Sequence, residues 1–126
     1  MDHAGNTEVA TYAFGLVLRQ FREQRGYRAA GRADEAVRIL QAQIDNMPAN
    51  LVRDRGHLTA KLAVTVVQAE QDPARAAYLG HQALGAAEQT SSARIRRELR
   101  ALDGALLERW PDHADVKAFH EALIAV

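Results

Sequence analysis

The amino-acid sequence predicts an all-α protein of about six helices, paired into three antiparallel hairpins. Apolar residues recur at the three- and four-residue spacing of one helix face along most of the chain, and no stretch alternates apolar and polar residues like a half-buried strand. Side chains of similar size also return every forty residues. With 126 residues, 48% of them hydrophobic, the chain has the size and composition of one domain. We place this domain at residues 7–126, after a polar tail of residues 1–6.

Six segments carry the helical pattern, and the short links between them favour antiparallel neighbours. The predicted helices span residues 7–30, 33–47, 51–71, 73–89, 92–109 and 113–125. Their apolar positions, in the same order, are Val9, Ala13, Leu16, Val17 and Phe21; Ala36, Val37, Leu40, Ile44 and Met47; Leu51, Leu58, Leu62, Val66 and Ala69; Ala76, Leu79, Ala83, Leu84 and Ala87; Ile95, Leu99, Leu102 and Leu106; and Val116, Phe119 and Leu123.

Several helix boundaries carry a recognisable signal. Asp72 before Pro73 is typical of an N-cap followed by proline at the first helical position, where the missing N–H group costs nothing. Pro48 closes the second predicted helix, since proline cannot continue the hydrogen-bond ladder. The other predicted caps are Asn50, the pair Ser91 and Ser92, and Asp112 with Asp115 as a capping box.

The forty-residue periodicity predicts that the hairpins stack on one another. A single helical hairpin cannot bury its apolar face alone, so successive copies need matched side-chain sizes at matched positions. A small residue near the start of each second helix, a bulky residue three positions later and the closing Pro48 are typical of tetratricopeptide (TPR) repeats. The columns are Tyr27, Val67 and Leu107; Ala36, Ala76 and Val116; Ile39, Leu79 and Phe119; and Ile44, Leu84 and Ile124. We expect a TPR-like, right-handed α-solenoid of three hairpins; the alternative is an ordinary six-helix bundle.

Three short strings carry a family resemblance. They are Arg53-Asp54-Arg55-Gly56, Leu79-Gly80 with Ala83-Leu84, and Ser92-Ala93-Arg94 leading into Glu98-Leu99. From about residue 27 to the end, the chain resembles the C-terminal TPR-like part of actinobacterial helix-turn-helix transcriptional regulators. The resemblance implies a non-enzymatic regulatory domain, which binds a ligand or partner and biases an attached DNA-binding domain. Residues 1–30 show no helix-turn-helix pattern, so we expect the DNA-binding domain outside this chain; the alternative is a free-standing scaffold or adaptor for other proteins.

Charge and composition argue against several kinds of partner. The 16 Lys and Arg residues balance 16 Asp and Glu residues, so we expect no direct nucleic-acid binding by this chain alone and no attraction to an anionic membrane. Two arginine clusters, interrupted by acids, are interpreted as solvated helix faces. No apolar run approaches the roughly 20 residues of a spanning helix, and the polar start is not a signal peptide. We therefore expect a cytoplasmic protein. The clusters are Arg19, Arg22, Arg25 and Arg28, and Arg94, Arg96, Arg97 and Arg100.

The sequence offers little for catalysis or for metal binding. The chain contains no cysteine, and its only serines, Ser91 and Ser92, are explained by capping. His113 and His120 lie seven residues apart on one helix face, whereas a tight metal site favours ligands four residues apart. We interpret both as surface histidines. The prediction is no enzyme, no cofactor and no metal.

The repeat register predicts a ligand groove on the concave face of the stack, with an aromatic end and three cationic side chains. Such a groove suits a protein, a peptide or a small acidic ligand. The predicted groove residues are Phe21, Arg25 and Arg28 from the first hairpin, with Lys61, Thr65 and Gln68 from the second. Phe14 and Leu18 extend an apolar face towards the open end of the solenoid, where upstream repeats or a second copy, as in a homodimer, would pack. The alternative for these two residues is ordinary core.

Overall fold

A computed structural model describes the backbone of residues 27–126 and the side chains of residues 31–126. This part is entirely helical, with no strand, so the all-α prediction is confirmed for it. The first predicted helix falls largely on residues 1–26, outside the described residues. None of the described helices has the length and apolarity needed to cross a membrane. The five described helices are α2 (Tyr27–Asp45), α3 (Val52–Ala69), α4 (Pro73–Thr90), α5 (Ala93–Arg109) and α6 (Ala114–Ile124).

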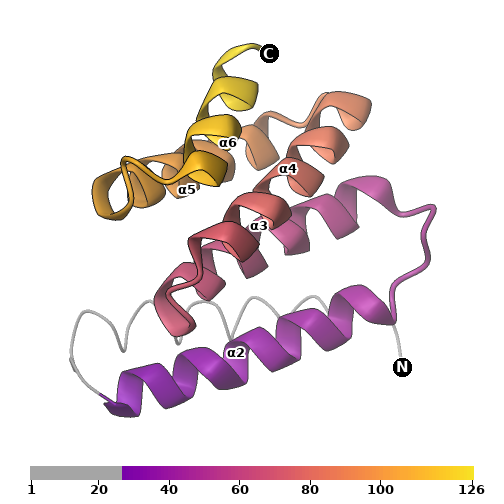
Figure 1. Cartoon of the computed structure of the whole chain (residues 1–126). Helices are drawn as coiled ribbons and strands as arrows, with labels where there is room; N and C mark the ends of the chain where they lie inside the picture. The colour runs from indigo at the N-terminus through magenta and orange to yellow at the C-terminus, as the bar shows by residue number, and fades with distance from the viewer. Residues whose placement is uncertain (1–26) are drawn as a thin grey trace.

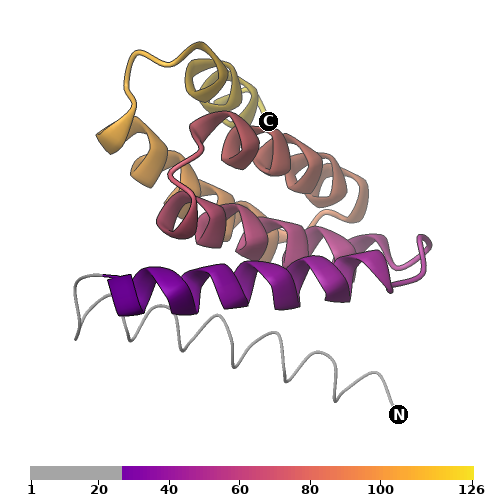
Figure 2. The same cartoon turned by 60° about the horizontal axis from the view of Figure 1, so that its bottom comes forward.

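Helix α3 is the central element of the described chain. It packs against α2 on one side and against α4 and α5 on the other, while α6 packs against α4 and α5. Figures 1 and 2 show α2 at one edge of the arrangement and the α5–α6 pair at the other. Among the described helices, α2 makes close backbone contact with α3 alone. The described helices are therefore layered along one direction, from α2 to the α5–α6 pair.

The columns of matched residues are largely buried. Ala36, Ala76 and Val116 are at most 2% exposed, as the stacking prediction requires of small residues between helices. The column of Ile44, Leu84 and Ile124 behaves differently, because its last member is 66% exposed. The largest fully buried side chains form the centre of the core. They are Leu40, Leu62, Thr65, Val66, Ile95, Leu99, Leu102, Leu106, Val116 and Phe119.

At the starts of α4 and α5, the structure confirms the N-caps predicted from the sequence. The Asp72 side chain accepts a hydrogen bond from the Arg75 backbone N–H at 3.1 Å, with Pro73 in the first turn of α4. Ser92 caps α5 in the same way, through the Ile95 N–H at 3.2 Å.

Three other boundary predictions are wrong. Helix α2 begins at Tyr27 and runs through Gly31 without the break predicted between residues 30 and 33; one exposed glycine lowers helix stability but does not force an end. The N-cap of α3 is Leu51, with no side-chain cap bond, in place of Asn50. The N-cap of α6 is His113, whose ring accepts from the Asp115 N–H at 3.1 Å, in place of Asp112.

A glycine on α4 sets the distance between α4 and α6. A Cβ atom at Gly80 would lie 2.8 Å from Phe119 Cε1 and 3.1 Å from Leu102 Cδ2, so only glycine leaves room for the aromatic ring. The position forty residues earlier on α2 is Leu40, and the counterpart of Phe119 on α4 is Leu79. The α4–α6 contact thus combines a glycine with an aromatic ring, whereas α2 has no glycine at the equivalent position, and α2 and α4 make no close backbone contact.

Candidate functional site

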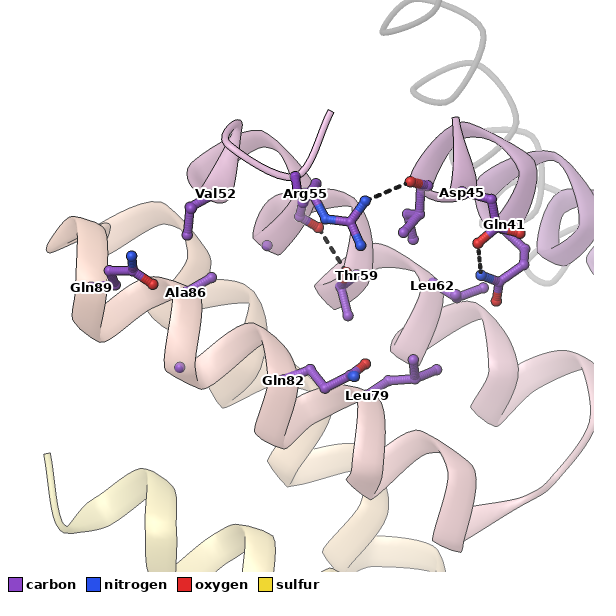
Figure 3. A pocket seen from close by; sticks show the side chains of 14 residues that line it. Gln41, Asp45, Val52, Arg55, Thr59, Leu62, Leu79, Gln82, Ala86 and Gln89 are labelled. Carbon is purple, nitrogen blue, oxygen red and sulfur yellow. Dashed lines mark hydrogen bonds between the residues drawn. The ribbon is translucent and has the colours of Figure 1, made fainter. Parts of the chain in front are cut away.

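The separation of α2 from α4 leaves a cleft of about 600 Å³. Helix α3 forms its floor, and α2 and α4 form its two walls (Figure 3). This volume lies within the range of roughly 300–1,000 Å³ that is typical of ligand pockets. The lining residues are Gln41, Ile44 and Asp45 from α2, Ala49 from the following loop, Val52, Arg55, Gly56, Thr59 and Leu62 from α3, and Leu79, Gln82, Gly85, Ala86 and Gln89 from α4.

The cleft has an apolar base and a polar rim. Ile44, Leu62 and Leu79 are buried core residues that reach its base. Gln82 and Gln89 lie on the exposed face of α4, so their amide groups stand at the opening. A carboxamide both donates and accepts hydrogen bonds, as a peptide group does. The arrangement is suited to a ligand with an apolar side facing inward and peptide-like groups facing the rim.

Arg55 on the floor holds the end of α2. Its Nη1 atom donates to the carbonyl oxygens of Ile44 at 2.8 Å and of Met47 at 3.2 Å. The last carbonyls of a helix have no partner within the helix and carry partial negative charge, so a guanidinium stabilises them. In Figure 3 the other side of the guanidinium points into the cleft, next to Thr59. The cleft thus contains one cationic group at a fixed place.

Polar side chains tie the helices together near both ends of the cleft. At one end, Arg75 Nη2 on α4 donates to Gln41 Oε1 on α2 at 3.3 Å, and Arg75 Nη1 contacts the Glu70 carboxylate at 2.7 Å. At the other end, Arg53 Nη2 on α3 donates to the Thr90 carbonyl at 3.1 Å. The wall of α4 between these ends, from residue 79 to residue 89, is about 15 Å long at 1.5 Å per residue.

A second polar cluster joins α3 to α5. His57 Nε2 lies 3.2 Å from Glu98 Oε1. Burial lowers the pKa of Lys61 below its usual 10.5, with the charge of Arg94 acting in the same direction and that of Glu98 opposing it. Among the described residues, Glu98 Oε2 and Gln68 Oε1 are buried and accept no hydrogen bond. This cluster is a seam between two helices, and a smaller pocket of about 350 Å³, lined in part by His57 and Arg94, lies beside it.

The predicted concave groove can be followed only in part. Phe14, Leu18, Phe21 and Arg25 lie outside the described residues, and the side chain of Arg28 is not described either. On α3, Lys61 is 6% exposed, and Thr65 is fully buried and donates its hydroxyl to the Lys61 carbonyl at 2.8 Å. Gln68 is half-buried. The predicted groove and the apolar assembly surface remain predictions.

The two histidines singled out in the sequence have separate partners. His113 caps α6, and His120 Nδ1 lies 2.8 Å from Asp103 Oδ2 on α5. Within the part of the chain that the structure describes, no three His, Asp or Glu side chains converge as metal ligands would. His120 is half-buried and not a plain surface residue, because it pairs with a carboxylate that is largely buried.

The cleft residues were missed in the sequence because no motif marks them. Gln82 and Gln89 look like ordinary solvated positions on a helix. A signal was nevertheless present in the forty-residue register: Leu40 stands where the next hairpin has Gly80. The glycine that permits the close α4–α6 contact therefore has no equivalent on α2, and α2 and α4 make no close contact.

No family model matches the chain, and neither a curated protein nor a solved structure matches it. The resemblance to helix-turn-helix regulators therefore remains a prediction. The function is argued below from the geometry of the cleft and from the pattern of the sequence.

Proposed function

We propose that this chain is a non-enzymatic, TPR-like binding domain of a transcriptional regulator, and that it holds a short extended segment of a partner protein in the cleft between α2 and α4. The observation that carries the proposal is the cleft itself: about 600 Å³ in volume, apolar at its base and bordered by glutamine amides. The packing order supports a repeat architecture, because the α5–α6 hairpin packs on the α3–α4 hairpin and α3 packs on α2.

The dimensions of the cleft favour an extended segment over a helix. The α4 wall is about 15 Å long, which matches four or five residues of extended chain at 3.3 Å each. A helix has a diameter of about 10–12 Å with its side chains, and a two-turn helix would exceed the available volume. Alternate side chains of an extended segment could point to the base at Leu62 and Leu79, while its main chain bonds to Gln82 and Gln89.

Arg55 adds a preference for one acidic group in the bound segment. Its guanidinium is already fixed by two carbonyl oxygens of α2, so little side-chain entropy is lost when a carboxylate binds. Asp45 on the adjacent wall limits this preference to a single acid, since a second carboxylate nearby would be repelled.

Peptide selection tests the cleft directly. A random peptide library is selected on the immobilised chain, and enriched sequences are measured by isothermal titration. Gly85 lines the cleft, and a Cβ atom there meets nothing within 4 Å, so Gly85→Phe should fill the cleft without disturbing the core. Gly31→Phe, at an equally open position that does not line the cleft, is the matched control. We expect Gly85→Phe to abolish binding and Gly31→Phe to retain it; no enrichment, or equal binding by both variants, would refute the proposal.

The regulatory role needs a separate experiment. Chromatin immunoprecipitation of the tagged natural gene product should recover defined DNA sites if the domain serves a transcriptional regulator. Gel shifts with the isolated chain should show no salt-sensitive binding, since its charges balance. If the natural gene product recovers no DNA while the peptide test succeeds, the chain is a scaffold or adaptor and not part of a regulator.

A further inference from the structure

The outer face of the α5–α6 hairpin carries an exposed apolar patch. Ile124 is 66% exposed and Val126 50%, and together with Leu123 they form one wall of a groove of about 520 Å³. The other wall is on α5, where Arg96 and Arg100 lie four residues apart on one face. Gly104, also on α5, lines the same groove.

The repeat register indicates what kind of element covers such a face. Ile44 and Leu84, the counterparts of Ile124 in the two earlier hairpins, are only 6% and 4% exposed. Helix α3 packs against α2, and α5 packs against both α3 and α4; in the described chain, the second helix of one hairpin is thus packed against the first helix of the next. The corresponding place beside Ile124 fits another helix with an apolar stripe.

The charges of Arg96 and Arg100 indicate that the covering helix differs from the first helix of a further repeat of the same kind. The counterparts of Arg96 and Arg100 on α3 are Gly56 and Ala60, which are both buried. Among residues 31–126, neither arginine side chain has an ion pair or a hydrogen bond. Asp103, a buried acid of α5 that lines the same groove, is paired with His120 at 2.8 Å. A covering helix therefore has to bring its own negative charge to this edge.

We infer that the groove between α5 and α6 docks an amphipathic helix of a partner protein, with an apolar stripe over Leu123, Ile124 and Val126 and acidic residues against Arg96 and Arg100. The inference rests on the proposed stacking of hairpins but not on the α2–α4 cleft. It gives the domain a second, independent contact on the opposite edge of the described chain.

Binding of a designed helix tests the inference. The probe is a labelled peptide of 17 residues, the length of α5, with leucines along one stripe and glutamates four residues apart beside it. Fluorescence anisotropy with the whole 126-residue chain should show saturable binding. The same peptide with lysine for glutamate should bind roughly tenfold more weakly, since two surface ion pairs together contribute about 1.4 kcal/mol. A peptide with the leucine stripe scrambled should not bind.

Variants of the groove give the decisive controls. Nothing lies within 4 Å of a Cβ atom at Gly104, so Gly104→Phe should fold normally by circular dichroism and block the groove. Gly85→Phe, in the α2–α4 cleft, should leave helix binding unchanged. Arg96→Glu with Arg100→Glu should reverse the preference towards the lysine peptide.

Equal affinity for the glutamate and lysine peptides, or undiminished binding by Gly104→Phe, would overturn the inference. Self-association that Gly104→Phe abolishes in light scattering would also overturn it, by assigning the groove to a second copy of the chain.

Discussion

The two sides of α4 are built from the same repeat pattern but pack differently. On one side, Phe119 of α6 fits against Gly80 and Leu102 and is fully buried. On the other side, Leu79 of α4 borders the cleft above Leu62, and Leu40 on α2 occupies the position that corresponds to Gly80. The closed interface contains a glycine and an aromatic ring that the open side lacks.

The difference shows how a helical repeat can acquire a binding site without a motif. Helices α2 and α4 make no close backbone contact with each other, while the shared central helix α3 packs against both. The gap costs little, because Arg55, Gln41 and Arg75 satisfy the polar groups around it. On the closed side the same space is filled by apolar atoms at core density.

The largest expected effect is on the closed side. Phe119→Ala should lower the free energy of unfolding by about 3–5 kcal/mol, because it removes a fully buried ring and leaves a cavity beside Gly80. Leu79→Ala is the counterpart on the open side. It should cost close to 2 kcal/mol, the low end for leucine, since Leu79 is 8% exposed and borders solvent in the cleft. Urea denaturation of both variants measures the difference, and equal losses would contradict the distinction between the two sides.

The second effect concerns two glycines on α4. Gly80→Ala should destabilise the protein by about 1–3 kcal/mol, because the added methyl group would lie 2.8 Å from Phe119 Cε1. Gly85→Ala, five residues along the same helix and facing the cleft, should stabilise it by up to about 1 kcal/mol, since alanine favours the helix and the space is open. Thermal melts should therefore shift in opposite directions. A shift of the same sign in both would show that Gly80 does not set the α4–α6 distance.

The fold was largely predictable from the sequence because helical periodicity and caps are local properties. The segments of α3, α4, α5 and α6 were predicted to within two residues at each end. The break predicted near Gly31 failed because local propensity alone does not end a helix that continues with good helix formers. Side-chain pairs between distant helices, such as His120 with Asp103, could not be predicted, since they depend on how the helices cross.

The candidate site was not predicted, for a related reason. The concave groove was placed by analogy with repeats in general, whereas the cleft depends on the separation of α2 and α4, which no motif in the sequence marks. Thr65 shows the limit of the analogy: its position in the register suggested a groove, yet it lies in the fully buried centre of the core. The forty-residue register shows which positions are equivalent in successive hairpins. The exposure of a residue depends instead on the helices that pack around it.

The third prediction concerns the pH dependence of stability that arises from Lys61 on α3, the central helix that packs against α2, α4 and α5. Its pKa is lowered below 10.5 in the folded protein, chiefly by burial. Between the lowered value and 10.5, the unfolded chain binds more protons than the folded one, so stability should rise with pH in that interval. Lys61→Met should remove this alkaline rise, whereas Lys117→Met, at an exposed position on α6, should retain it. Urea titrations across the alkaline range measure the effect; an unchanged rise in Lys61→Met would assign it to other groups.

The smallest expected effect lies at the bridge between α2 and α4. Arg75 reaches Gln41 at 3.3 Å and Glu70 at 2.7 Å, and exposed pairs of this kind contribute about 0–1 kcal/mol. Arg75→Met should therefore leave global stability almost unchanged. It should nevertheless loosen α2, which among the described helices is held by α3 and this bridge. Native-state hydrogen exchange of α2 amides should therefore accelerate by up to about fivefold while α6 exchange stays constant. Arg38→Met, at an exposed position of α2 without such a bond, is the control and should change neither. Faster exchange in α6 as well would mean that the open and closed sides unfold as one unit.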